Sequence, residues 1–167
     1  AKIASKVLGI TLTKRSNGAA GEVPLAGFPY HAIDAYLPKL VKAGYRVAIC
    51  EQMENPKFAK GIVKREVIEV ISPGVAFSDK ILDHKKNNYI ASLFFDNSIV
   101  GIGFGDISTG DFFCYEQPIE KIHEQVENIK PSEILCQKKD RDTIQKILEK
   151  IGHSARISKI DDWIWDY

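Results

Sequence analysis

The sequence predicts a mixed α/β protein made of two units, and three observations support this. Short β-rich runs alternate with segments whose apolar residues recur at helical spacing. Residues 1–76 carry 11 lysines and arginines against 6 acidic residues, whereas residues 77–167 carry 12 against 16. A polar stretch without an apolar period separates these regions. We therefore predict a small α+β domain over residues 1–76, a linker over 77–88 and an α/β domain over 89–167.

Composition is that of an ordinary globular chain of 167 residues, with 44% apolar and 27% charged residues. No apolar run approaches the ~18 residues that cross a membrane, and no signal peptide is evident. The three cysteines have no metal-ligand spacing, and Cys50 and Cys114 lie in apolar, strand-like runs. We expect both to be buried free thiols of a protein in a reducing cytoplasm.

The first domain is expected to begin with a helix over residues 1–8, which Gly9 ends, and a strand over 10–14. A flexible turn over 15–22 leads into a shaped loop over 21–31, where Pro24 and Pro29 fix the backbone. Residues 32–43 have a helical apolar pattern, and Pro38 should kink this helix or start a second one. Strands are predicted over 45–52 and 64–72, with a loop between them.

The second domain is expected to open with three strands over residues 89–95, 99–107 and 111–115. Turn-forming residues at 96–98 and 108–110 join these strands, so an antiparallel meander follows. Helices over 118–129 and 141–151 then alternate with strands over 133–137 and 155–160, which makes an α/β unit. Trp163 and Trp165 alternate around Ile164 and are expected to bury one face against this domain.

The loop over residues 21–31 and the basic pair before it form the first candidate site. The loop holds two glycines, two prolines and two aromatic residues but no lysine or arginine. It could be an ordered connector against a core, or a rigid loop presented to a partner. In the second case Lys14 and Arg15 would supply positive charge for phosphates.

Asp106 and Asp111 form the second candidate site, because they flank a turn of Ile-Ser-Thr-Gly. An enzyme of another class, a ribonuclease-H-like nuclease or an actin-like ATPase, could use these carboxylates. Two-metal chemistry needs several convergent carboxylates, however, and aspartate is common in tight turns for its side-chain hydrogen bonds. Gly101, Gly103 and Gly105 lie within a strand, not at a strand-to-helix turn, so they do not predict a phosphate loop.

Four sequence blocks, in order, closely resemble the N-terminal part of the MutS family, the DNA mismatch-recognition ATPases. They are Ile10-Thr11-Leu12-Thr13-Lys14-Arg15, Val23-Pro24-Leu25-Ala26-Gly27-Phe28-Pro29-Tyr30-His31-Ala32, Val47-Ala48-Ile49-Cys50-Glu51-Gln52 and Ile71-Ser72-Pro73-Gly74. The resemblance is dense over residues 1–76 and looser beyond. It implies an incomplete mismatch-recognition domain followed by a C-terminally truncated, ribonuclease-H-like connector domain. Both ends of the chain look cut, so we expect a fragment of a mismatch-repair protein.

The resemblance also implies a set of DNA-contacting residues and partners. DNA binding falls on Thr13, Lys14 and Arg15 near the backbone, and on Pro24, Leu25 and Ala26 near the minor groove. The family's Phe-x-Glu reading motif is missing, and so is its ATPase domain, where ATP and magnesium would bind. We thus expect no catalysis, cofactor or metal in this chain. The expected partners are mismatched duplex DNA, a MutL-type protein on the connector and a second copy of the parent, with no membrane.

Overall fold

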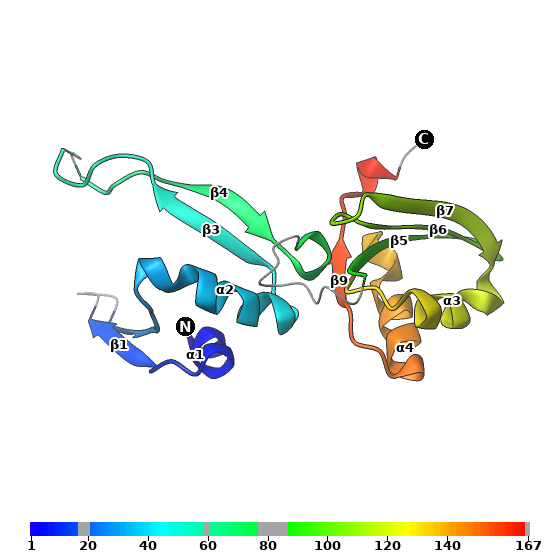
Figure 1. The fold of residues 1–167 in the computed structure, drawn as a ribbon, viewed down its shortest axis with the longest axis horizontal. Helices are drawn as coiled ribbons and strands as arrows, with labels where there is room; N and C mark the ends of the chain where they lie inside the picture. Colours follow the sequence, from blue (N-terminus) through cyan, green and yellow to red (C-terminus); the bar gives the residue numbers. More distant parts are fainter. Residues whose placement is uncertain (17–20, 59–60, 77–86, 166–167) are drawn as a thin grey trace. The chain divides into compact units, whose positions relative to one another are not determined.

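The computed structural model describes residues 1–16, 21–58, 61–76 and 87–165, and its chain forms two compact units, Ala1–Ile71 and Ser72–Tyr167 (Figure 1). Helices and strands occur in both units, so the predicted mixed α/β class is confirmed. Residues 72–76, which sequence analysis placed in the first domain, belong to the second unit. Most of the predicted linker, residues 77–86, lies outside the described residues.

The described residues of the first unit form two helices and two separate antiparallel strand pairs. In chain order these are α1 (Lys2–Leu8), β1 (Thr13–Ser16), β2 (Glu22–Leu25), the 3-10 turn η2 (Tyr30–Ala32), α2 (Ile33–Lys42), β3 (Val47–Gln52) and β4 (Arg65–Ile71). Strand β1 pairs with β2, and β3 pairs with β4. Leu8 on α1 and Val41 on α2 are buried. Strand β2 occupies part of the predicted loop over 21–31, so that part of the prediction was wrong.

Helix α2 places its apolar residues along one side, and Ile33, Leu37 and Leu40 line a pocket that β3 also lines. The helix continues through Pro38, so the second short helix that we considered does not form. Strand β3 alternates between partly buried and exposed residues, and Cys50 falls on its exposed side. The prediction that Cys50 is buried was therefore wrong, because an apolar strand pattern does not show which face another element covers.

The second unit is built on a five-stranded sheet in the order β7-β6-β5-β8-β9. Its strands are β5 (Tyr89–Asp96), β6 (Ile99–Asp106), β7 (Asp111–Pro118), β8 (Glu133–Cys136) and β9 (Arg156–Lys159). The first three form the predicted antiparallel meander, while β5, β8 and β9 run parallel. This combination is what the ribonuclease-H-like prediction requires.

Helices α3 (Ile122–Ile129) and α4 (Arg141–Ile151) cover one face of this sheet (Figure 1). The 3-10 turns η4 (Ile119–Lys121) and η5 (Lys138–Asp140) precede them. Gly152 ends α4 in the left-handed conformation, at φ 64°, which glycine adopts without strain. The core between helices and sheet is formed by Leu93, Val100, Ile102, Ile122, Val126, Ile129, Ile134, Cys136, Ile144, Ile147 and Leu148.

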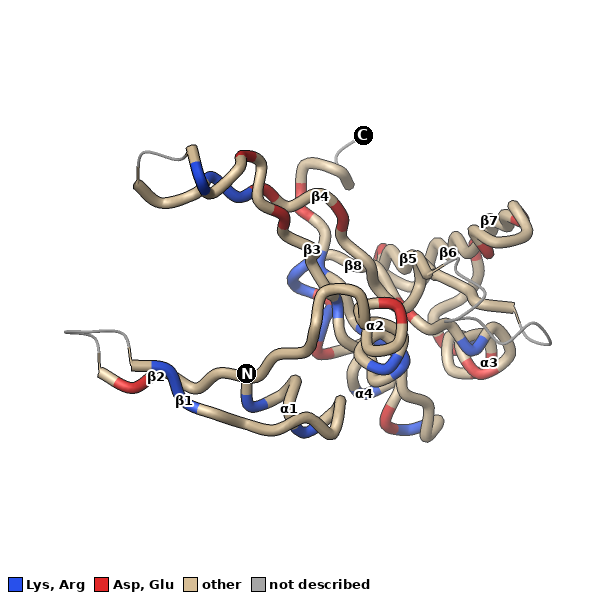
Figure 2. The backbone as a smooth tube through the Cα atoms, turned by 60° about the vertical axis from the view of Figure 1, so that its left-hand side comes forward, with Lys and Arg blue, Asp and Glu red and all other residues tan. Residues whose placement is uncertain are grey.

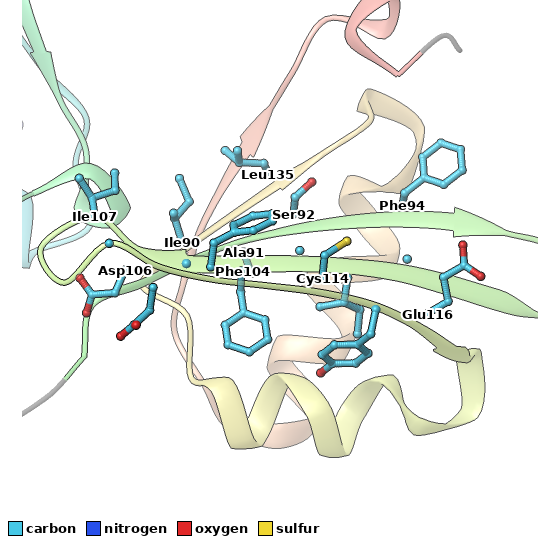
Figure 3. Close-up of a pocket in the computed structure, with 18 residues that line it drawn as sticks. Ile90, Ala91, Ser92, Phe94, Phe104, Asp106, Ile107, Cys114, Glu116 and Leu135 are labelled. Carbon is cyan, nitrogen blue, oxygen red and sulfur yellow. The ribbon is translucent and has the colours of Figure 1, made fainter.

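The opposite face of the sheet is largely open and forms a hollow of about 610 Å³ (Figure 3). Phe94 lies on this face and stacks on Trp165, with ring centroids 5.9 Å apart. Trp165 thus packs on the domain as predicted, whereas Trp163 is 72% exposed. Cys114 also lies on the open face and is exposed, which corrects the second cysteine prediction. Among the helices described, none is long and apolar enough to span a membrane.

Candidate nucleic-acid interface

The first candidate site is an antiparallel ribbon, because β1 and β2 pair along their whole length. Thr13 lies opposite Leu25, Lys14 opposite Pro24, Arg15 opposite Val23 and Ser16 opposite Glu22. The Thr13 hydroxyl donates a hydrogen bond of 3.1 Å to the Leu25 carbonyl oxygen. Both strands are edge strands, so Pro24 is tolerated although it has no N–H to donate. The basic pair and the proline-rich segment therefore meet side by side.

Lys14 and Arg15 nevertheless project from opposite faces of this ribbon. Successive residues of a strand alternate between faces, and directly opposed residues share one. One face consequently carries Thr13, Arg15, Val23 and Leu25, and we call it the Arg15 face. The other carries Lys14, Ser16, Glu22 and Pro24. All eight residues are exposed, so neither face is buried in a core.

The two faces differ in electrostatic character. Lys14 Nζ lies 2.7 Å from Glu22 Oε2, so its charge is matched on its own face. Figure 2 shows the basic part of β1 beside an acidic position of β2. Arg15 makes no ion pair with any residue that the structure describes. Its neighbours Val23 and Leu25 are 44% and 46% exposed. The Arg15 face therefore combines an uncompensated guanidinium with apolar side chains, which suits contact with a phosphate and an adjacent sugar.

The segment after β2 is attached to the rest of the first unit by aromatic residues. Phe28 stacks on Tyr36 of α2 with ring centroids 4.5 Å apart. The Tyr30 hydroxyl donates a hydrogen bond of 2.9 Å to Glu51 of β3, and this bond, with the negative charge of Glu51, raises the pKa of Tyr30. These contacts fix where the chain leaves β2, at the half-buried Ala26.

The structure thus brings together five of the six predicted DNA-binding residues, but on two faces. Thr13, Arg15 and Leu25 share the Arg15 face, and Lys14 and Pro24 share the other. Ala26 lies just beyond the ribbon. Sequence analysis did not select Val23, which completes the Arg15 face. The period of two would have identified Val23 had β2 been recognised as a strand.

Asp106 is the last residue of β6, and its side chain caps the turn that leads to β7, as the turn interpretation predicts. Its Oδ1 accepts hydrogen bonds from the backbone N–H and the hydroxyl of Ser108, at 2.8 and 2.6 Å. Its Oδ2 accepts one from the Asn88 N–H at 2.7 Å. Burial acts to raise the pKa of Asp106, but hydrogen bonds from Ser108, Asn88 and Thr109 outweigh it and lower that pKa. Both carboxylate oxygens therefore have structural partners.

Asp111 is directly opposite Asp106 at the end of the hairpin, and its carboxylate accepts a hydrogen bond from the Thr109 hydroxyl at 2.7 Å. In the described part of the chain no group of three or more His, Cys, Asp or Glu side chains is placed to hold a metal ion. The arrangement supports the turn interpretation over a two-metal site, which needs further convergent carboxylates. The enzyme alternative therefore gains no support from this hairpin.

Comparison with known proteins gives two family matches, one after the other along the chain. The family model described as MutS domain I matches residues 1–80, and that described as MutS domain II matches residues 88–164. Similar curated proteins include "DNA mismatch repair protein MutS" of Flavobacterium psychrophilum, 49% identical over 97% of this chain, and that of Cytophaga hutchinsonii, 49% identical over 98%. The protein of the same name from Chlorobaculum tepidum is 40% identical over 96%.

These relatives are much longer than the present sequence. The matched region covers 18% of the Flavobacterium protein and 19% of each of the other two. The chain therefore spans less than a fifth of their length.

Proposed function

The chain belongs to the MutS family, and from this premise we propose that its first unit contacts the backbone of duplex DNA in a protein that recognises mispaired or unpaired bases. The second unit, matched by MutS domain II, is proposed to act as the connector. Family membership supports the DNA assignment, and the Arg15 face supports its location.

The Arg15 face is the observation that carries this proposal. A guanidinium that lacks a described ion-pair partner can take a phosphate without first losing an intramolecular contact. Each phosphate that a cation neutralises releases condensed counterions, which favours binding at low salt. Leu25 and Val23 on the same face offer an apolar surface to the sugars of the minor groove.

Discrimination between matched and mismatched DNA is assigned to another part of the parent protein. No phenylalanine in this sequence is followed two residues later by glutamate, so the family's Phe-x-Glu motif does not occur in it. The contacts available on the Arg15 face are to phosphate and sugar, which position a protein without reading bases. We therefore assign the ribbon an orienting role beside the reading motif.

The whole protein is proposed to act as its family does. It would be a homodimeric, DNA-dependent ATPase of the cytoplasm that binds ATP and magnesium in a domain other than the two matched here. A MutL-type protein would bind the connector. The chain itself has no Walker-type phosphate loop, so we propose that it performs no catalysis of its own.

Fluorescence anisotropy with the 167-residue chain, across a salt series and with matched and mismatched duplexes, tests the proposal. Arg15→Gln should reduce the magnitude of the slope of log K against log salt by about 0.9, the value for one lost phosphate contact. Lys146→Gln, a change to an exposed lysine on α4 of the second unit, is the matched control and should leave the slope unchanged. Equal slopes for the wild type and Arg15→Gln would refute the assignment.

A further inference from the structure

Residues Ser72–Ala76 follow β4 directly and lie near the end of the region matched by MutS domain I, yet they are almost wholly buried. Ser72 and Ala76 are each 3% exposed, and Pro73 and Gly74 are buried as well. Only Val75, in the short 3-10 turn η3 (Pro73–Val75), reaches the surface. A connecting segment with buried polar backbone needs hydrogen-bond partners. Among the described residues, the side chains that hydrogen-bond to this segment belong to the second unit.

Glu133, at the start of β8, is the first of these partners and is itself only 3% exposed. Its Oε2 accepts a hydrogen bond from the Ser72 hydroxyl and another from the Gly74 N–H, at 3.0 Å. Its Oε1 accepts a third from the Ser158 hydroxyl of β9, at 2.6 Å. A buried carboxyl group whose oxygens all have donors is stably held. Glu133 thus ties the segment to two strands of the sheet.

Gly74 makes the close approach to Glu133 possible. A Cβ at this position would lie 2.7 Å from Glu133 Cβ and 2.9 Å from Ile90 Cβ, far inside van der Waals contact. Any other residue would therefore force the segment or its neighbours Glu133 and Ile90 to shift.

Asn88 holds the other side of the segment. Its Nδ2 donates hydrogen bonds to the carbonyl oxygens of Pro73, at 2.8 Å, and Ala76, at 3.3 Å. Its own position is fixed, because its Oδ1 accepts a hydrogen bond from the Ser132 hydroxyl and its N–H donates to Asp106. The residues on either side of 77–86 are thus bonded to each other within one unit.

We propose that the second unit carries an internal docking site for Ser72–Ala76, formed by Glu133, Asn88 and Ile90, and that the joint between the two units is the Ile71–Ser72 peptide bond. Ala76 and Asn88, on either side of residues 77–86, then both belong to the second unit, so the joint precedes that stretch. Strand β4 ends at Ile71, and the next residue is already docked. The polar stretch 77–88, which composition predicts to be the linker between the two domains, would then not be the segment that joins them.

The chain's own cysteines provide the probes for a test. Cys50 in the first unit and Cys114 in the second are exposed, whereas Cys136 is buried and should not react with a spin label. Pulsed electron paramagnetic resonance between labels on Cys50 and Cys114 measures the distribution of distances between the units.

Two matched insertions of about six Gly and Ser residues, each of which adds a flexible spacer, decide where the joint lies. An insertion between Ile71 and Ser72 should broaden the distance distribution, and the same insertion between Lys80 and Ile81 should leave it unchanged. If the second insertion broadens the distribution as much as the first, or the first has no effect, the proposal is refuted.

The docking residues are tested by combining the Lys80–Ile81 insertion with a change at the site. Gly74→Ala should undock the segment, so the insertion should now broaden the distribution. Gly27→Ala, where a Cβ would meet no atom within 4 Å, is the matched control and should not. Glu133→Gln, combined with the same insertion, should also broaden the distribution, because the new amide N–H group would face the donors that now bind the Glu133 carboxylate. The exposed Glu127→Gln is its control.

Hydrogen exchange at the Gly74 amide gives a second measurement that does not depend on the labels. This N–H should be protected in the wild type and in the Glu127→Gln control, and should exchange faster in Glu133→Gln. Unprotected exchange at Gly74 in the wild type would contradict the docking site even if every variant folds.

Discussion

Lys14 Nζ lies 2.7 Å from Glu22 Oε2 across the β1–β2 ribbon, and this ion pair distinguishes Lys14 from its neighbour Arg15. The two basic residues are adjacent in sequence but project from opposite faces. Of the two faces, the Arg15 face combines exposed apolar side chains with a cation that has no ion-pair partner among the described residues. The pair therefore should not contribute equally to DNA binding.

Glu22→Gln should strengthen DNA binding at low salt, because it releases Lys14 and removes a negative charge that repels phosphate. An exposed ion pair is worth about 0–1 kcal/mol, so the gain should not exceed about fivefold. Anisotropy at low and high salt measures it. The control is Glu66→Gln, which breaks the similar exposed pair with Lys64 at 2.6 Å in the same unit. An equal gain in both variants would mean that overall charge, and not the ribbon, is responsible.

Leu25→Ala should weaken binding to matched and mismatched duplexes alike without changing the salt slope. Leu25 is 46% exposed, and a DNA contact could bury that remaining surface, worth about 1 kcal/mol or a fivefold loss of affinity. An apolar contact displaces no counterion, so the slope should stay constant. The same salt series supplies the measurement. A flatter slope in Leu25→Ala would show that the ribbon had been distorted.

Asp106→Asn should destabilise the second unit by about 1–3 kcal/mol at neutral pH, because an amide N–H group would face a donor in the turn. The lowered pKa of Asp106 means that its ionised form stabilises the fold above the unfolded-state value near 4. This stabilisation is lost as pH falls through the folded-state pKa. Urea unfolding at pH 7 and in acid should show a difference between wild type and variant that shrinks in acid.

The exposed Asp142→Asn on α4, whose side chain is 86% exposed, is the control for that experiment. It should unfold like the wild type at both pH values. A difference between wild type and Asp106→Asn that stayed constant from neutral to acidic pH would contradict the role given to the Asp106 carboxylate.

Sequence periodicity was sufficient for the elements that pack against a core. Helix α4 spans the predicted residues 141–151, because its apolar residues face the sheet and Gly152 stops it. The strands β5 and β6 were likewise found to within one residue at each end. In such elements burial imposes the pattern from which they are predicted.

Strand β2 was missed because it has only four residues, all of them exposed, and the alternation of Val23 and Leu25 is too short to mark a strand. Pro24 also argued against a strand, but it is accepted where a ribbon has a free edge. The candidate site was therefore predicted as a set of residues, whereas its division into two faces needed the register. Cys50 and Cys114 show the same limit, since the covered face of a strand depends on distant segments.

The central claim is that the Arg15 face contacts duplex DNA, and a nuclear magnetic resonance titration of the labelled 167-residue chain with a duplex tests it most directly. The methyl signals of Val23 and Leu25 and the Nε–H signal of Arg15 should shift as DNA is added. The methyl signal of Ile144, in the core of the second unit, should stay in place. Shifts confined to the second unit, with the Val23, Leu25 and Arg15 signals unmoved, would contradict the account.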